Sequence, residues 1–427
     1  MNKVSVSDIA NIYIGGTPDT TIKKYWDGDI YWASAKDISN CKSRYIESTE
    51  KKITLEAIKN SAAKMLPKNT IVVTSRGTVG KICLLPFSMS FYQTCYGLVA
   101  KEGIEPLFLF YKLKSLFEQI NQLSYGTVFS TITIKNFNDL IFNLPSMEEQ
   151  KAIAHILGTL DDKIELNKKM NETLEAMARA IFKSWFVDFD PVRAKAEGRD
   201  TGLPKWIADL FPKSLENSEL GSIPYEWKIK SLYSCAEFIN GSAFKDEDFS
   251  SNQSGLPIVK IVELKNGITV QTKFTNKHIE SKYIINDGDI LFSWSGSPDT
   301  SIDIFIWAGG LACLNQHIFK VIPYQTGERS FIYFLLRFLK PMFIEIARNK
   351  QTTGLGHVTS QDMKEIPVVF PQNNIIERFD NILRNIFLFS IIHHSINHSY
   401  QFHSLWSLLI THRTQPPRGC LCNHARI

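Results

Sequence analysis

Apolar positions in the middle of the chain recur at steps that alternate between four and three residues. The run follows Pro145 and opens with Ser146 and Glu149, the capping box expected at the start of a helix. This heptad spacing is typical of a helix that lies along another helix. At about 1.5 Å per residue, the predicted helix is roughly 60 Å long and forms a strut between two bodies. Its seam positions are Ile153, Leu157, Leu160, Ile164, Asn167, Asn171, Leu174, Ala178, Ile181 and Trp185.

The same signal returns after Phe370-Pro371, and similar segments precede the two copies. The aligned segments are residues 67–77 with 286–296, residues 108–113 with 331–336, and residues 132–133 with 358–359. In the second helix, Phe379, Leu383 and Ile386 take the places of Ile153, Leu157 and Leu160. A repeat of this length is not that of a solenoid. It predicts a duplicated α+β domain, with a long helix after each copy.

The predicted organisation alternates globular and connecting segments. The globular segments are residues 1–145 and 227–371, and a central helix covers 146–190. Residues 191–226 contain repeated Gly and Pro and are predicted to be a linker. Residues 372–386 are predicted to form the start of the second helix. Residues 387–427 are an atypical tail, because no Asp, Glu or Lys follows Asp380 and an exposed helix normally carries such residues.

Composition limits the classes of protein that this chain can belong to. An apolar content of 44% over 427 residues supports two domains with cores of their own. Seven scattered cysteines are typical of reduced thiols in a cytoplasmic protein, and no apolar run is long enough to cross a membrane. The net charge of +5 is small for a protein that grips DNA through charge alone. If the partner is nucleic acid, we expect other subunits to share the phosphate contacts.

Catalytic signals are weak in this sequence. The run from Ser75 to Ile82 approximates a phosphate-binding loop but lacks the hydroxyl that should follow Lys81. Asp19 and Glu50 have the residue types of a metal-dependent nuclease, which stays open as an alternative. We find no adenine methyltransferase motif and expect neither a catalytic residue nor a metal ligand in this chain.

Two further groups of residues are candidates for binding. Asn at a helix seam costs stability but fixes register, so Asn167 and Asn171 are expected to face a polar partner. Polar and aromatic loop side chains are candidates for contacts with base edges and phosphates. In the first copy these are Tyr31, Lys36, Arg76, Thr78, Gln93, Tyr125 and Thr127. In the second copy they are Ser295, Ser297, Gln316, Thr353 and His357.

Several motifs make the chain similar to the specificity subunits of type I restriction-modification systems, over roughly residues 8–386. The most specific is Ala180-Ile181-Phe182-Lys183-Ser184-Trp185-Phe186-Val187-Asp188-Phe189-Asp190-Pro191. Others are Gly15-Gly16-Thr17-Pro18, Trp26-Asp27-Gly28-Asp29-Ile30-Tyr31-Trp32, Glu149-Gln150-Lys151-Ala152-Ile153-Ala154 and Gly221-Ser222-Ile223-Pro224-Tyr225-Glu226-Trp227. The chain departs from the family pattern at the tail, where a charged second helix should continue past Ile386.

The resemblance implies two tandem target-recognition domains separated by two long antiparallel coiled-coil helices. The domains would read a split, asymmetric site in double-stranded DNA, and the helices would set the spacing between its two halves. Leu157, Leu160, Ile164, Asn167, Asn171, Leu174, Ile181 and Trp185 would then serve the spacer helix and subunit docking. Two methyltransferase subunits and the restriction subunits would be the partners, and they would bind S-adenosylmethionine, ATP and Mg. A self-contained DNA-binding repressor is the other alternative; it should bind its site tightly without partners.

Overall fold

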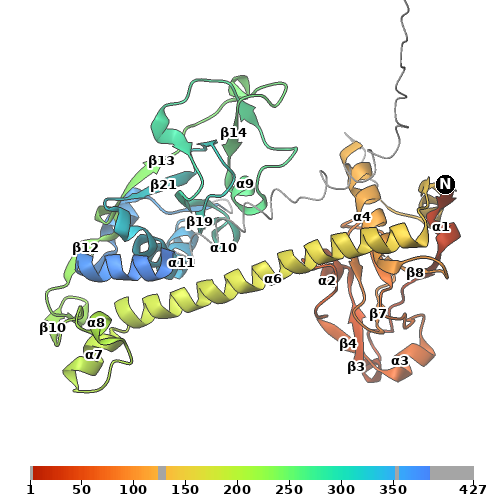
Figure 1. Cartoon of the computed structure of the whole chain (residues 1–427), viewed down its shortest axis with the longest axis horizontal. Coiled ribbons are helices and arrows are strands. Elements are labelled where there is room, and N and C mark those ends of the chain that lie inside the picture. Colours follow the sequence, from red (N-terminus) through yellow and green to blue (C-terminus); the bar gives the residue numbers. More distant parts are fainter. Residues whose placement is uncertain (1–2, 124–130, 352–354, 385–427) are drawn as a thin grey trace, which may run out of the picture. The chain divides into compact units, whose positions relative to one another are not determined.

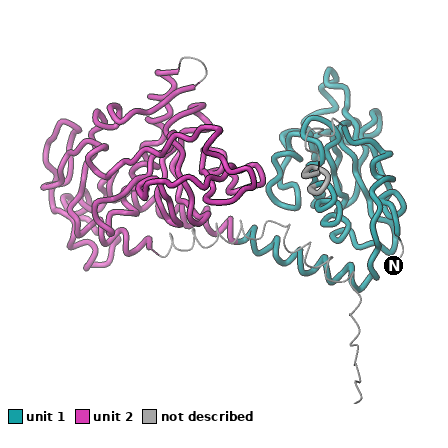
Figure 2. The backbone as a smooth tube through the Cα atoms, turned by 90° about the horizontal axis from the view of Figure 1, so that it is seen from above, with its two compact units in different colours: residues 1–166, 402–427 teal, residues 167–401 magenta. Residues whose placement is uncertain are grey.

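The computed structural model describes residues 3–123, 131–351 and 355–384 (Figure 1). The described chain forms two compact units, which we call unit 1, up to Leu166, and unit 2, from Asn167 onward (Figure 2). The boundary falls inside one helix, α6 (Met147–Phe186), so both units include part of it. The expected tail, 387–427, lies outside the described residues, as do Tyr125, Thr127 and Thr353.

Unit 1 contains a four-stranded antiparallel sheet in the order β2-β8-β5-β6. Its strands are β2 (Ala10–Ile14), β8 (Cys95–Ala100), β5 (Ile71–Thr74) and β6 (Ile82–Leu84). The central strand β5 is buried over its whole length, which explains its run of β-branched residues. A smaller sheet joins β4 (Lys51–Ile53), β3 (Trp26–Ala33) and β7 (Ser90–Phe91), and β1 (Lys3–Ser5) pairs with β9 (Ile141–Asn143).

The helices of unit 1 are short except for α4 (Pro106–Leu123). The others are α1 (Val6–Ile9), η1 (Lys23–Tyr25), α2 (Ala35–Asn40), α3 (Leu55–Asn60) and α5 (Ile134–Asp139). Phe108, Leu109 and Tyr111 of α4 pack into one core with β5, and Leu157 of α6 belongs to the same core. This end of α6 is therefore part of unit 1.

Unit 2 repeats this plan with a four-stranded sheet in the order β13-β21-β17-β19. The strands are β13 (Ala236–Asn240), β21 (Ile318–Pro323), β17 (Ile290–Ser293) and β19 (Asp303–Ile306). A second sheet contains β15 (Phe274–Thr275), β14 (Leu256–Val259), β20 (Ala312–Leu314) and β16 (Ile284–Ile285). The two pairs are β12 (Lys228–Ser231) with β23 (Pro367–Phe370), and β18 (Ser295–Gly296) with β22 (Gly356–His357).

The long helix of unit 2 is α11 (Arg329–Asn349). The shorter ones are η2 (Leu232–Ser234), η3 (Asp246–Asp248), α9 (Ile261–Asn266), η4 (Ser281–Tyr283), α10 (Pro298–Ser301), η5 (Thr326–Glu328) and α12 (Ser360–Glu365). Residues 373–384 are helical too. Phe379 and Leu383 are fully buried in the core of unit 2, as their places in the second copy predict, whereas Ile386 lies outside the described residues.

The two units confirm the duplication. Strands β5 and β17 begin at Ile71 and Ile290, the residues that the sequence alignment pairs, and each lies between equivalent neighbours in its sheet. Helices α4 and α11 follow at equivalent places, and Thr133 and Thr359 cap the next helices, α5 and α12. Each unit is a mixed α and β domain, and the two stand in tandem.

Helix α6 begins with the capping box predicted for it. The Ser146 amide donates to Glu149 Oε2 at 3.1 Å, and the Glu149 amide donates to Ser146 Oγ at 3.3 Å. Every predicted seam position is buried or half-buried, whereas Leu166 and Met170, beside the seam, are exposed. Asn167 is 8% exposed. Asn171 Oδ1 is buried, and the described part of the chain gives it no hydrogen-bond partner.

The segment 191–226 is folded, which corrects the prediction of a linker. It contains most of α7 (Asp190–Ala196), then α8 (Lys205–Ala208) and the hairpin of β10 (Leu215–Ser218) with β11 (Gly221–Pro224). Val192, Ile207 and Phe211 are buried in the core of unit 2. The Gly and Pro residues therefore mark turns between short packed elements rather than an extended chain.

The helices of the described residues show no candidate for a membrane span, since none is both long enough and apolar enough.

Candidate nucleic-acid interface

The end of strand β5 in unit 1 is held by backbone hydrogen bonds on two sides. The Ser75 amide donates to the Thr94 carbonyl at 2.9 Å, and the Ile132 amide donates to the Ser75 carbonyl at 2.9 Å. Arg76 follows and forms an isolated antiparallel bridge with Thr131. The Arg76 side chain is exposed, so this arrangement presents a guanidinium to solvent beside the bridge to Thr131.

Unit 2 has the same arrangement at the end of β17. The Trp294 amide donates to the His317 carbonyl at 3.3 Å, and the Val358 amide donates to the Trp294 carbonyl at 2.9 Å. Ser295 then pairs with His357 in the β18–β22 ladder. Ser295 is half-buried and His357 is exposed. The structure therefore brings together these two predicted residues, which lie far apart in the sequence.

These equivalent hydrogen bonds define a common frame, by which we mean the backbone at residues 75–76, 94 and 131–132 in unit 1 and at 294–295, 317 and 357–358 in unit 2. The backbone of the frame is shared, but its side chains differ. A guanidinium stands at Arg76 where unit 2 has the Ser295 hydroxyl, and a hydroxyl stands at Thr131 where unit 2 has the His357 imidazole. Two copies of one scaffold thus present different hydrogen-bonding groups.

A glycine beside the frame is required by close packing in both units. A Cβ at Gly15 would lie 2.2 Å from the Tyr92 carbonyl oxygen, and a Cβ at Gly241 would lie 2.2 Å from the Asn315 carbonyl oxygen. Both distances are far below van der Waals contact, and each obstacle is backbone. The Gly15-Gly16 motif of the sequence therefore fixes how the β2 end approaches the loop before β8.

The remaining predicted residues of unit 1 lie on exposed loops and on α2. The Thr78 and Ser39 hydroxyls are in hydrogen-bond contact, which ties the loop after β5 to α2. Lys36 on α2 forms an exposed ion pair with Glu50, with 3.4 Å between Nζ and Oε2. Gln93 is exposed and lies two residues before β8.

Tyr31 is more firmly packed than a free recognition side chain. It lies on β3, its ring centroid is 5.1 Å from that of Phe87, and Lys52 Nζ stands 4.4 Å from the ring centroid. The contacts found for the Tyr31 ring, with Phe87 and Lys52, are therefore structural ones.

In unit 2, Ser297 is the N-cap residue of α10, and Gln316 lies two residues before β21, as Gln93 does before β8. The Asn315 amide group donates to Gln316 Oε1 at 2.7 Å. This bond leaves the amide nitrogen of Gln316 as a donor at a half-buried position.

Sequence reasoning missed a polar and aromatic cluster in unit 2. Trp294 Nε1 donates to Asn240 Oδ1 at 3.0 Å, and the His317 ring lies 5.8 Å from the Trp294 ring, between centroids. His317 is exposed. The sequence alignment could have pointed to this cluster. It pairs Ser75 of the first copy with Trp294 of the second, at a position of the frame where the backbone is shared and the side chains differ.

The carboxylates of the nuclease alternative are engaged elsewhere. Asp19 Oδ1 accepts hydrogen bonds from the Thr21 hydroxyl at 2.7 Å and from its amide at 2.9 Å, and these bonds lower the pKa of Asp19. Glu50 pairs with Lys36. Within residues 3–123, 131–351 and 355–384, no cluster of His, Cys, Asp and Glu has the makeup of a metal site. The described chain gives this alternative no support.

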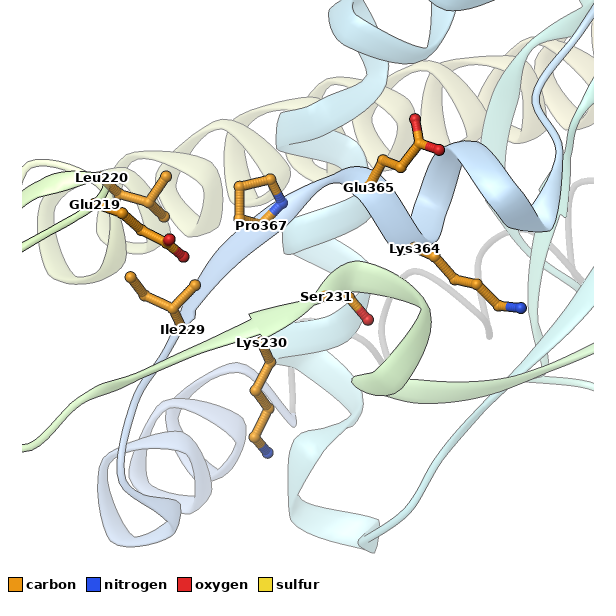
Figure 3. A pocket seen from close by; sticks show the side chains of 8 residues that line it. All are labelled: Glu219, Leu220, Ile229, Lys230, Ser231, Lys364, Glu365 and Pro367. Atoms are coloured by element: carbon orange, nitrogen blue, oxygen red, sulfur yellow. The ribbon is translucent and has the colours of Figure 1, made fainter.

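A shallow groove of about 540 Å³ lies on unit 2, between the β10–β11 turn, β12, β23 and α12 (Figure 3). Its two lysines are held against aromatic rings, since Lys230 Nζ is 3.7 Å from the Phe370 ring centroid and Lys364 Nζ is 5.3 Å from that of Tyr233. In Figure 3 these lysine side chains point in different directions. The groove therefore offers no convergent set of charges for phosphate or for catalysis.

Comparisons with known proteins agree with the duplicated plan. The family model described as the type I restriction modification DNA specificity domain matches residues 1–176 and 224–397. The chain is 29% identical over 390 residues to the type I restriction enzyme MjaIX specificity subunit of Methanocaldococcus jannaschii, covering 90% of this chain and 85% of that protein. It is 27% identical over 333 residues to the HindI specificity subunit of Haemophilus influenzae, covering 66% of this chain and 71% of that protein.

The comparison with solved structures supports the same fold. One similar structure is the S subunit of a type I restriction-modification system from M. genitalium, with a TM-score of 0.51 and 16% sequence identity. The similarity covers 93% of this chain and 92% of that one. At this identity the comparison supports the tandem two-domain fold alone.

Proposed function

Because this chain belongs to the family of type I restriction-modification DNA specificity proteins, and is a DNA-recognition subunit rather than an enzyme, we propose that its two units read the two halves of a bipartite, asymmetric site in double-stranded DNA. One observation carries this proposal: equivalent backbone positions in the two units hold different hydrogen-bonding side chains. A common frame with different side chains favours two different half-sites.

In unit 1 the proposed reader is Arg76, with Lys36, Thr78 and Gln93 around it. An exposed guanidinium at a strand end suits the bidentate contact with O6 and N7 of guanine, the commonest specific contact in the major groove. Lys36 is paired with Glu50 on an exposed surface, so it suits a phosphate contact in which DNA displaces the carboxylate.

In unit 2 the proposed readers are Ser295, Ser297, Gln316 and His357. Hydroxyl, amide and imidazole groups donate and accept single hydrogen bonds, which suits a mixed base sequence rather than a guanine-rich one. The proposed contacts also include Thr353 and, in unit 1, Tyr125 and Thr127, which lie outside the described residues.

The spacing between the half-sites is the proposed role of α6. The helix is continuous for 40 residues, and its last turns pack against residues 373–384. The ring of Phe379 lies 5.0 Å from that of Phe186 and 6.0 Å from those of Phe182 and Trp185, between centroids. These contacts support a helix pair at this end of α6. We extend them to an antiparallel coiled coil on which other subunits dock.

The chain would assemble with two methyltransferase subunits and with restriction subunits that translocate and cleave DNA in the cytoplasm. S-adenosylmethionine, ATP and Mg would bind to those partners. The small net charge of +5 fits a subunit that shares its phosphate contacts with others.

Co-expression with the methyltransferase subunit of the same system, followed by mapping of methylated adenines, tests this function. The expected result is one bipartite, asymmetric motif with a fixed spacer, and no methylation when either protein is absent. Methylation or cleavage by this chain alone, or an undivided motif, would contradict the proposal.

A further inference from the structure

A charged network anchors α6 to unit 1. Arg44, in the loop after α2, donates from Nη1 to the Gly158 carbonyl at 2.8 Å and from Nη2 to Asp162 Oδ1 at 2.5 Å. The Tyr111 hydroxyl of α4 donates to Asp161 Oδ2 at 2.8 Å. Burial raises the pKa of Tyr111, so the hydroxyl stays protonated and keeps donating over the working pH range. Two elements of unit 1 thus hold one turn of α6.

Gly158 allows close packing of α4 against this turn of α6. A glycine inside a helix costs about 1 kcal/mol relative to alanine, so its presence there calls for a packing reason. A Cβ at Gly158 would lie 3.1 Å from Leu107 Cδ2 and 3.6 Å from Arg44 Nη1. The missing side chain therefore lets Leu107 of α4 pack close to the helix backbone, whereas a Cβ would only be in ordinary contact with Arg44.

A second network anchors α6 within unit 2. Arg337 on α11 donates to Glu175 on α6 at 3.0 Å and to Asp303 on β19 at 2.7 Å. Lys340 pairs with Asp303 at 2.7 Å, and Arg179 pairs with Glu175 at 3.2 Å. The Arg337 side chain is 19% exposed and that of Glu175 is 33% exposed, so water screens this pair less than a surface ion pair.

The two ends of α6 belong to different hydrophobic cores. Ala154 and Leu157 belong to the core of unit 1, and Ala178 and Phe182 belong to that of unit 2. The seam positions between them, Leu160 to Leu174, join neither of these hydrophobic clusters of the described residues. The two charged networks therefore lie at the inner ends of the two apolar cores that the described residues form with the helix.

We propose that the Arg44 and Arg337 networks fix the place of each unit on α6, so that the segment between them, residues 163–174, sets the spacing of the two half-sites. This inference rests on the proposed spacer role of α6 and goes beyond it by naming positioning residues and the spacing segment. About 20 Å of helix lies between Asp162 and Glu175. The networks act through the helix and do not touch bases.

The test uses the full chain in its complex with the methyltransferase subunit. Arg44→Met and Arg337→Met remove the charge and keep the aliphatic stem. Each variant is expected to leave both half-sites unchanged. Methylation at sites whose spacer is one base pair longer or shorter should rise on the order of tenfold relative to the parent, because each lost hydrogen bond involves a charged group. Lys24→Met and Lys282→Met remove equally charged but exposed ion-pair partners away from α6 and serve as matched controls.

Amide hydrogen exchange gives a second readout that is independent of DNA. Arg44→Met should speed exchange near residues 158–166 and leave 178–186 unchanged, and Arg337→Met should speed exchange near residue 175. Arg44→Lys should restore part of the spacing fidelity, because it keeps the charge opposite Asp162 but cannot also reach the Gly158 carbonyl in the same fork geometry. If Arg337→Met does not fold, Glu175→Gln removes one charge of the same pair and carries the test.

An insertion separates the proposed segment from the rest of the helix. Four residues placed between Asn167 and Asn171 add roughly 6 Å, which should lengthen the recognised spacer by one or two base pairs with both half-sites unchanged. Normal spacing in the insertion variant, or strict parental spacing in both Met variants despite faster local exchange, would overturn the inference. Absence of any bipartite methylation by the parent complex would instead overturn the proposed function.

Discussion

At the end of β5 in unit 1 the exposed group is the Arg76 guanidinium, whereas at the end of β17 in unit 2 it is the His357 imidazole, beside the half-buried Ser295. The backbone hydrogen bonds around these groups are equivalent in the two units. The two copies of the fold share the backbone of the frame, and they differ in the side chains that the frame carries. The difference separates residues that build a recognition domain from residues that choose its target.

The residues that build the frame should be the most sensitive to change. Gly15→Ala and Gly241→Ala each place a Cβ 2.2 Å from a backbone oxygen, so each should destabilise its own unit by about 1–3 kcal/mol or more. Hydrogen exchange should show loss of protection in β8 for the first variant and in β21 for the second. Equal stability of both variants and the parent in denaturant would show that the frame is not held this tightly.

Side chains on the frame should change specificity without changing stability. Arg76→Ala should weaken recognition of one base pair, in the half-site of unit 1, by about 1–3 kcal/mol. His357→Ala should relax the other half by less, because an imidazole nitrogen makes a single hydrogen bond where a guanidinium makes a bidentate contact. Methylation of a library of site variants measures both effects, with Arg199→Met as a surface control. Relaxation of the same half by both variants would contradict the assignment.

The helices after the two frames should differ in acid sensitivity. Thr359 caps α12 together with Asp362, whereas at the equivalent place Thr133 is paired with Asn136, which does not titrate. Burial acts to raise the pKa of Asp362, but hydrogen bonds from Lys350 and from the Thr359 amide and hydroxyl together lower it below its ordinary value.

The contribution of this carboxylate is therefore complete above the ordinary Asp pKa of about 3.9 and is lost as the pH falls through the lower folded value. Between pH 5 and pH 2, hydrogen exchange corrected for its intrinsic pH dependence should show a loss of protection in 360–365 but not in 134–139. Asp362→Asn should remove the difference. Equal acid sensitivity of the two caps would contradict this explanation.

Patterns that are local in sequence predicted the scaffold well. The Ser146 capping box and the seam of α6 depend on spacing along one segment, and the structure has both. The alignment of Ile71 with Ile290 compares two such segments, and each residue begins the equivalent strand of its unit. The repeat made the prediction of the scaffold stronger, because the second copy has the same order of elements as the first.

Features that depend on distant contacts were harder to predict. Residues 191–226 were expected to be a linker, yet Phe211 packs against Trp185 with 5.1 Å between ring centroids, a contact that composition does not reveal. The hydrogen bond from Trp294 to Asn240 joins residues 54 positions apart and was missed. Ser295 and His357 were named separately, and only the β18–β22 ladder shows that they are neighbours.

Exchange of residues 227–371 for the equivalent domain of another family member tests most directly whether the two units are independent readers on one frame. Adenine methylation by the chimaera, mapped across a genome in complex with the same methyltransferase subunit, should show one half of the motif replaced and the other half kept. A change in both halves, or in neither, would contradict independent recognition by the two units.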